Sequence, residues 1–153
     1  MTTQEIYNYI QVNEHLITGG QPTEAQIRSA AEEGFTSVIN LATFHPGESL
    51  DDEARLVQSL GMSYYAIPVV WSAPQASDFQ AFERVMQQVS PGKTLLHCAA
   101  NFRVTAFYSL FALKHLGWSP AQAQSFRAQI WEGSDIPVWD QFIQTLTAQI
   151  LAR

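Results

Sequence analysis

Short β-rich segments alternate with helical segments along the 153 residues of this chain. The β-rich segments lie within residues 5–18, 36–42, 62–70 and 93–97. Helical segments lie at residues 23–33, 51–60, 77–90 and 103–116, and two more open near residues 119 and 137. Two parallel strands need a long crossover connection between them, and this connection is usually a helix. We therefore expect an α/β fold with a mostly parallel central sheet of about four or five strands flanked by helices.

Length and composition suit one domain over residues 1–153. Hydrophobic residues make up 46% of the chain, and a chain of this size buries roughly 70% of its unfolded surface without a disulfide or metal. The single cysteine, Cys98, cannot form an internal disulfide, which fits a reducing cytoplasm. Residues 1–20 lack a secretory signal, and no apolar run reaches the ~20 residues of a membrane-spanning helix. We expect a cytoplasmic protein outside the membrane; a periplasmic location would require a signal segment beyond this sequence.

The charge of the chain excludes nucleic acid as an expected partner. The formal net charge is −6, the only lysines are Lys93 and Lys114, and the arginines are scattered. Binding to a phosphate backbone needs clustered Lys and Arg. An anionic substrate must therefore be held by one focused site.

Three helix starts carry capping signals. Thr23 with Gln26 and Ser77 with Gln80 both have the spacing of a capping box. A serine–proline pair at residues 119–120 places serine at the cap and proline in the first turn.

The segment "KTLLHCAANFRVTAFYSL", residues 93–110, predicts a strand, a short loop and an apolar helix. Cys98 follows the strand, and Arg103 opens the helix. Ligands bind α/β sheets at the carboxyl ends of strands, and loop N–H groups with a helix N-terminus form an anion site there. The same positive field would favour the thiolate of Cys98. The alternative is a buried, inert thiol, since free cysteine is among the most buried residue types.

The position of Arg103 in the sequence is stronger evidence for an anion site than the position of Cys98. The helix dipole disfavours a cation at a helix N-terminus unless a bound anion or a carboxylate side chain pairs with that cation. The planar guanidinium of Arg103 can bind two oxygens of a tetrahedral anion, which lysine cannot do. The alternative for Arg103 is a salt bridge to an acidic side chain.

The order His-Cys, short loop, Arg resembles the signature of cysteine-dependent phosphatases of the tyrosine and dual-specificity type. The segments "ITGGQPTEAQI", "GFTSVINL", "LGMSYYAIPV" and "HCAANFRV" are similar to a small bacterial phosphatase-like family named beta-lactamase hydrolase-like. The resemblance covers roughly residues 10–115 and implies a protein tyrosine phosphatase-like fold.

The resemblance also implies roles for individual residues. Cys98 would be the nucleophile that forms a phosphocysteine intermediate, Arg103 would bind phosphoryl oxygens, and His97 would buttress the loop. The backbone of four residues would form the phosphate cradle: Ala99, Ala100, Asn101 and Phe102. The substrate would be a phosphorylated small molecule or a phosphoprotein, with phosphotyrosine as a candidate.

We expect no metal and no cofactor. The four histidines show no paired spacing such as His-x-x-x-His, and the lone cysteine has no thiol partner. Neither a GxGxxG nor a Walker sequence occurs.

The sequence departs from the phosphatase signature at three positions of the loop and helix. Four residues separate Cys98 from Arg103, where the superfamily usually has five; four is the spacing of rhodanese-like sulfurtransferases. Asn101 replaces the loop glycine, and asparagine tolerates positive φ better than other non-glycine residues. Val104 stands where a serine or threonine usually helps the thiolate leave, and Thr105 follows it.

A general acid is not evident. Related phosphatases place an aspartate after the strand that corresponds to residues 62–70, but here the first acidic residue is Asp78. Asp78 is also well placed as a first-turn helix carboxylate. His45 and Glu48, on the loop after "INL", are other candidates, although such residues are more often simply solvated.

Two further features are expected near the loop or in the core. The turn at residues 19–22 (GGQP) falls at a strand–helix junction, and the resemblance places it near the Cys98 loop. The four tryptophans are expected in the core or in pocket walls: Trp71, Trp118, Trp131 and Trp139.

Three functions remain open from the sequence. The first is a phosphatase that hydrolyses a phosphomonoester through a phosphocysteine. The second is a phosphate-binding pseudo-phosphatase or regulatory domain, motivated by Val104 and the missing acid. The third is a rhodanese-like sulfurtransferase, motivated by the loop length.

Overall fold

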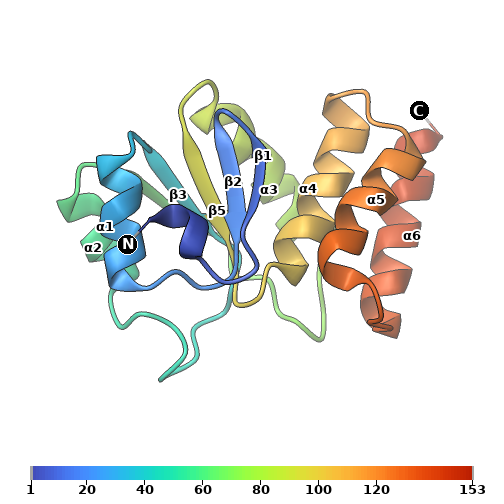
Figure 1. The fold of residues 1–153 in the computed structure, drawn as a ribbon. Helices are drawn as coiled ribbons and strands as arrows, with labels where there is room; N and C mark the ends of the chain where they lie inside the picture. The colour runs from blue at the N-terminus through green and yellow to red at the C-terminus, as the bar shows by residue number, and fades with distance from the viewer. Residues whose placement is uncertain (1, 153) are drawn as a thin grey trace.

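A five-stranded sheet in the order β1-β2-β5-β3-β4 organises the computed structural model, which describes residues 2–152 (Figure 1). The strands are β1 (Ile10–Asn13), β2 (Leu16–Gly19), β3 (Ser37–Asn40), β4 (Ser63–Ala66) and β5 (Thr94–His97). The β1 strand pairs antiparallel with β2, and the other pairs are parallel. This confirms the predicted mostly parallel α/β sheet and places β5, the strand that leads to Cys98, at its centre.

Helices cover both faces of the sheet (Figure 1). They are η1 (Thr3–Glu5), α1 (Glu24–Glu32), α2 (Glu53–Ser59), α3 (Ala76–Val89), α4 (Phe102–His115), α5 (Pro120–Trp131) and α6 (Pro137–Leu151). One apolar cluster joins α1 and α2 to one sheet face, and a larger one joins α3 to α6 to the other. The α4 helix is buried from Arg103 to Leu113, because the sheet, α3, α5 and α6 surround it.

The predicted capping box at Thr23 and the predicted serine cap at Ser119 are confirmed, and the predicted capping box at Ser77 is wrong. The hydroxyls of Thr23 and Ser119 accept hydrogen bonds from the N–H groups three residues later, as predicted. The predicted box at Ser77 does not form, because α3 begins one residue earlier, at Ala76. The carboxylate of Asp78 instead accepts the backbone N–H of Gln75 at 3.0 Å.

The strands are shorter than their β-rich sequences suggest, since β4 ends at Ala66 and leaves residues 67–75 as a loop.

Within residues 2–152, no helix combines the length and apolar character needed to cross a membrane.

Candidate active site

The loop between β5 and α4, which we call the Cys98 loop (residues 98–103), lies at the carboxyl edge of the central strand. Cys98 follows the last residue of β5, and α4 begins at Phe102. Cys98 and Arg103 are both buried, with 1% and 5% of their surfaces exposed, whereas Ala99 is exposed. The predicted strand–loop–helix arrangement is therefore present, with the thiol and the guanidinium on the two arms of one short loop.

The carbonyl groups of the Cys98 loop are held by the neighbouring segments. The Ala99 carbonyl accepts the backbone N–H of Gln21 at 3.0 Å, and the Ala100 carbonyl accepts the side-chain amide of Asn8 at 3.0 Å. Apart from the bridge between Gly20 and Ala100, the described part of the chain has no hydrogen bond in which a backbone N–H group of residues 99–104 is the donor. Two carbonyl groups of the loop are thus held by neighbouring segments, and the N–H groups outside the bridge are available to an anion, as an anion cradle requires.

The turn at residues 19–22 lies directly against the Cys98 loop, as expected. Gly20 forms an isolated β-bridge with Ala100. A Cβ atom at Gly20 would lie 2.6 Å from the Ala99 carbonyl oxygen, so only glycine allows this close approach.

Asn101 supplies the left-handed turn before α4, with φ of 70°. It is fully buried, and its amide nitrogen donates to the Asn8 carbonyl at 2.8 Å and to the Thr18 hydroxyl at 3.0 Å. Asparagine therefore does more than replace a glycine, because its side chain ties the loop to β2 and to the segment before β1.

Arg103 is buried without a carboxylate partner. One of its guanidinium nitrogens, Nη1, donates to the Val69 carbonyl at 2.9 Å, and the guanidinium lies 5.9 Å from the ring centre of Trp71. Among residues 2–152, no ion pair includes Arg103. The predicted alternative, a salt bridge to an acidic side chain, is not formed there.

A buried hydrogen-bond network, which the sequence did not predict, connects α2 to the start of the Cys98 loop. His97 Nε2 lies 2.6 Å from Glu53 Oε2, and His97 Nδ1 lies 3.1 Å from the Cys98 carbonyl oxygen. The side chain of Gln21 donates to the other oxygen of Glu53 at 2.8 Å. His97 and Glu53 are 0% and 6% exposed. His97 therefore buttresses the loop, as the resemblance implies, with Glu53 behind it.

The charge of Glu53 is stabilised by its neighbours. Burial raises the pKa of Glu53, but the positive charge of His97 and hydrogen bonds from His97, Gln21 and Tyr64 outweigh it, so the pKa is lowered. Burial and the Glu53 carboxylate together raise the pKa of Tyr64 to about 12. Glu53 lies on α2, and nothing in its local sequence signals a partner 44 residues away.

The β4–α3 loop brings an aromatic side chain, rather than a carboxylate, to the Cys98 loop. Trp71 is 38% exposed and packs on Phe102 at a ring-centre distance of 6.0 Å. Trp131 and Trp139 pack against Trp71, and the indole N–H of Trp131 donates to the Phe102 carbonyl at 3.0 Å. Three of the four tryptophans thus form a wall beside the loop.

The candidate acids lie on two different segments. Asp78 is in the first turn of α3, where its carboxylate accepts the Gln75 N–H. His45 and Glu48 lie exposed on the β3–α2 loop, and His45 Nε2 is 3.0 Å from the Thr43 hydroxyl.

The positions after Arg103 do not present a hydroxyl to the thiol. Val104 is fully buried in the core. The Thr105 hydroxyl donates to the Asn101 carbonyl at 2.8 Å and accepts the indole N–H of Trp131 at 3.1 Å.

In residues 2–152, no group of His, Cys, Asp and Glu side chains has the arrangement of a metal site.

Comparisons with known proteins place this chain among phosphatase-like proteins, although no family model matches its sequence. A crystal structure described as "Putative phosphatase (DUF442)" from Shewanella putrefaciens CN-32 is 32% identical, with a TM-score of 0.86. The match covers 96% of this chain and 95% of that one.

A "Beta-lactamase hydrolase-like protein" of Xylella fastidiosa is 30% identical over 106 residues, or 66% of this chain. This chain spans about a quarter of that curated relative, since the match covers 24% of its length.

The fold extends to distant proteins. The core catalytic domain of the PP-IP phosphatase SIW14 from S. cerevisiae superposes with a TM-score of 0.73 at 14% identity, covering 91% of this chain and 85% of that one. At this identity the likeness shows the fold alone. The predicted protein tyrosine phosphatase-like fold is confirmed.

Proposed function

The chain belongs to the DUF442 family of phosphatase-like proteins, and on that premise we propose that it is a cysteine-dependent phosphatase that hydrolyses a phosphomonoester. The observation that carries the proposal is the Cys98 loop. Apart from the bridge to Gly20, its backbone N–H groups donate to no group of the described chain, and the carbonyls of Ala99 and Ala100 are bonded to Gln21 and Asn8. The buried Arg103 has no carboxylate partner among residues 2–152. A buried cation is normally paired. A phosphate group on the loop would supply the missing charge.

The proposed reaction has two steps. In the first, Cys98 Sγ attacks phosphorus, the S–P bond forms, and the bond to the leaving oxygen breaks. In the second, water attacks phosphorus, the S–P bond breaks, and inorganic phosphate leaves as the thiolate is restored. Arg103 and the backbone N–H groups of residues 99–103 stabilise the charge on the phosphoryl oxygens in both steps.

The substrate class we propose is an aryl phosphate, including phosphotyrosine. An aryl oxygen leaves with less need for a proton than an alkyl oxygen, which suits a site without an evident acid. Trp71, exposed beside Phe102, offers an aromatic surface for the aryl ring.

Hydrolysis of p-nitrophenyl phosphate by the wild type and by Cys98→Ser tests the proposal. We expect a loss of about 10³-fold or more in the variant, because serine is a far weaker nucleophile. Thermal melting of both proteins controls for folding. Equal rates would remove Cys98 as the nucleophile, and binding of vanadate without turnover of any phosphate ester would favour the pseudo-phosphatase.

Asp78 as the general acid is tested by Asp78→Asn, because asparagine can still accept the Gln75 N–H but cannot donate an acidic proton. Since the carboxylate is used as a helix cap, we expect hydrolysis of phenyl phosphate, whose leaving oxygen needs a proton more than p-nitrophenolate does, to remain within about twofold of wild type. A loss of about 10²-fold with an unchanged melting temperature would instead identify Asp78 as the acid.

A sulfurtransferase is the second candidate, favoured by the four residues between Cys98 and Arg103. Cys98 would take the outer sulfur of thiosulfate and release sulfite, and cyanide would then remove that sulfur as thiocyanate. Cys98-dependent thiocyanate formation, together with no hydrolysis of aryl phosphates, would decide for this function over the phosphatase.

A further inference from the structure

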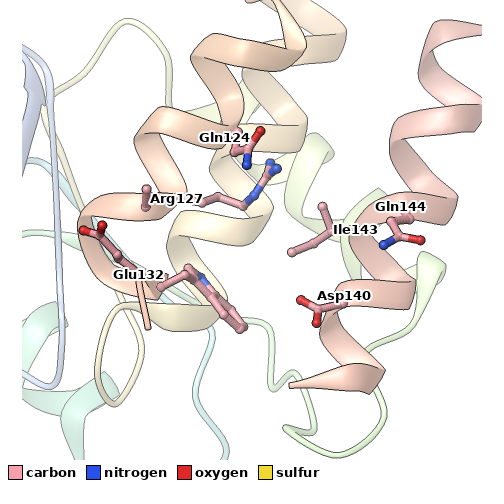
Figure 2. Close-up of a pocket in the computed structure, with 8 residues that line it drawn as sticks. Gln124, Arg127, Glu132, Asp140, Ile143 and Gln144 are labelled. Atoms are coloured by element: carbon pink, nitrogen blue, oxygen red, sulfur yellow. The ribbon is translucent and has the colours of Figure 1, made fainter. Parts of the chain in front are cut away.

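A groove runs between α5 and α6, apart from the Cys98 loop. Both helices pack on α4, and two cavities of about 620 and 400 Å³ lie between them. Figure 2 shows the larger cavity, with side chains from the two helices facing each other. The cavities share four residues and so form one groove: Gln124, Arg127, Ile143 and Gln144.

Arg127 places a positive charge in this groove, in a cavity that Glu132 and Asp140 also line. Its side chain extends from α5 toward α6 (Figure 2), and its Nη1 donates to the Ser109 hydroxyl on α4 at 2.9 Å. In the described chain, no ion pair includes Arg127, and burial lowers the pKa of its guanidinium. A partly buried cation beside a cavity is stabilised if an anion occupies that cavity.

The residues at the two ends of the groove indicate which chemical groups the rest of a ligand should carry. The end beyond Arg127 toward the C-terminus of α6 is apolar, with these residues in its wall: Leu113, Pro120, Ala123, Ala148 and Leu151. The opposite end carries Glu132 and Asp140, which repel a second negative charge. The groove therefore suits one negative charge at its middle and an apolar chain on one side.

We propose that this groove binds a monocarboxylate with an apolar tail, such as a medium-chain carboxylic acid. The carboxylate accepts two hydrogen bonds from guanidinium N–H groups of Arg127 that do not face Ser109. The apolar tail lies along Leu113 and Ala148. This site is independent of the proposed chemistry at Cys98.

Trp131 connects the groove to the Cys98 loop. It lines the larger cavity, and its indole N–H donates to the Phe102 carbonyl and to the Thr105 hydroxyl. A carboxylate bound at Arg127 would therefore lie in the same cavity as the side chain that holds the start of α4. The NMR signal of the Trp131 indole N–H is a reporter of binding that does not depend on activity.

The test is calorimetric titration of the full chain with decanoate, below the concentration at which decanoate forms micelles. We expect Arg127→Met to weaken decanoate binding by about tenfold or more, because a charge-assisted bidentate contact is lost. Arg84→Met, which removes an exposed arginine of α3, serves as the matched control and should bind decanoate as the wild type does. Decanol and decyl phosphate should bind more weakly than decanoate.

Two results would overturn the proposal: equal decanoate affinity in the wild type and Arg127→Met, or decanol binding as tightly as decanoate. If Arg127→Met does not fold, Ala148→Phe fills the apolar end from an exposed position and should weaken decanoate binding. Unchanged decanoate binding in Ala148→Phe would then count against the site. Cys98→Ser should bind decanoate normally, so that failure of the phosphatase proposal and failure of this one give different results.

Discussion

Glu53 supports the Cys98 loop indirectly, through His97 and Gln21. Its carboxylate is buried, and a buried carboxylate is costly unless it is paired and hydrogen-bonded. Here His97 and Gln21 satisfy both oxygens. His97 in turn contacts the Cys98 carbonyl oxygen. Under the proposed mechanism, Glu53 is a positioning residue that acts on the proposed nucleophile, Cys98, through His97.

Glu53→Gln should lower both activity and stability, because glutamine keeps the shape but loses the charge that faces His97. We expect about a tenfold loss of kcat for p-nitrophenyl phosphate with little change in KM, since misplacement of the nucleophile affects the chemical step. We also expect a loss of about 1–3 kcal/mol in the free energy of unfolding, measured in urea. Glu32→Gln, at an exposed position at the end of α1, is the control. An unchanged kcat in Glu53→Gln would show that the pair only stabilises the fold.

The lowered pKa of Glu53 also predicts a pH dependence of stability. A carboxyl group whose pKa is lower in the folded state favours folding above its ordinary value of 4.5, and that contribution disappears as the pH falls through the folded-state pKa. The wild type should therefore lose free energy of unfolding below about pH 4.5 more steeply than Glu53→Gln. Urea unfolding of both proteins at neutral and acidic pH measures the difference. Parallel pH profiles would mean that the pKa of Glu53 is the same in the folded and unfolded protein.

The short loop between β5 and α4 depends on a left-handed residue, and Asn101 provides it. Replacement by alanine and replacement by glycine both remove the bonds to Asn8 and Thr18. Only alanine also carries the strain of positive φ, about 1 kcal/mol. Asn101→Ala should thus unfold at lower urea than Asn101→Gly. The reverse order would show that chain entropy, rather than backbone strain, dominates at this turn.

Local sequence patterns predicted the elements well and their tertiary partners poorly. The β5–loop–α4 unit and the turn at residues 19–22 follow from strand, loop and glycine chemistry within short windows of sequence, whereas the family resemblance indicated that this turn lies near the Cys98 loop. The Ser77 capping box failed because the Asp78 carboxylate captures the Gln75 N–H and starts α3 earlier. Glu53 was missed because its role depends on contacts to Gln21 and His97 that only the folded sheet creates.

In the whole molecule, the sheet separates two apolar clusters and leaves the Cys98 loop at one edge between them. The proposed substrate must approach that edge against a formal net charge of −6. Arg103 supplies a positive charge there, but it is buried and acts at short range. The β3–α2 loop adds exposed acidic residues to the same edge, because it follows the carboxyl end of β3.

Salt should therefore increase kcat/KM for an aryl phosphate, which carries nearly two negative charges at neutral pH. Raising the ionic strength from about 10 to 150 mM screens the repulsion, and we expect an increase of about twofold. The double variant Glu48→Gln, Asp51→Asn removes two exposed charges of the β3–α2 loop and should reduce this salt effect. Glu14→Gln, in the β1–β2 turn at the opposite edge of the sheet, should retain it. A decrease of kcat/KM with salt in the wild type would show instead that the local field of Arg103 and the loop N–H groups outweighs the net charge, so that substrate is attracted from a distance.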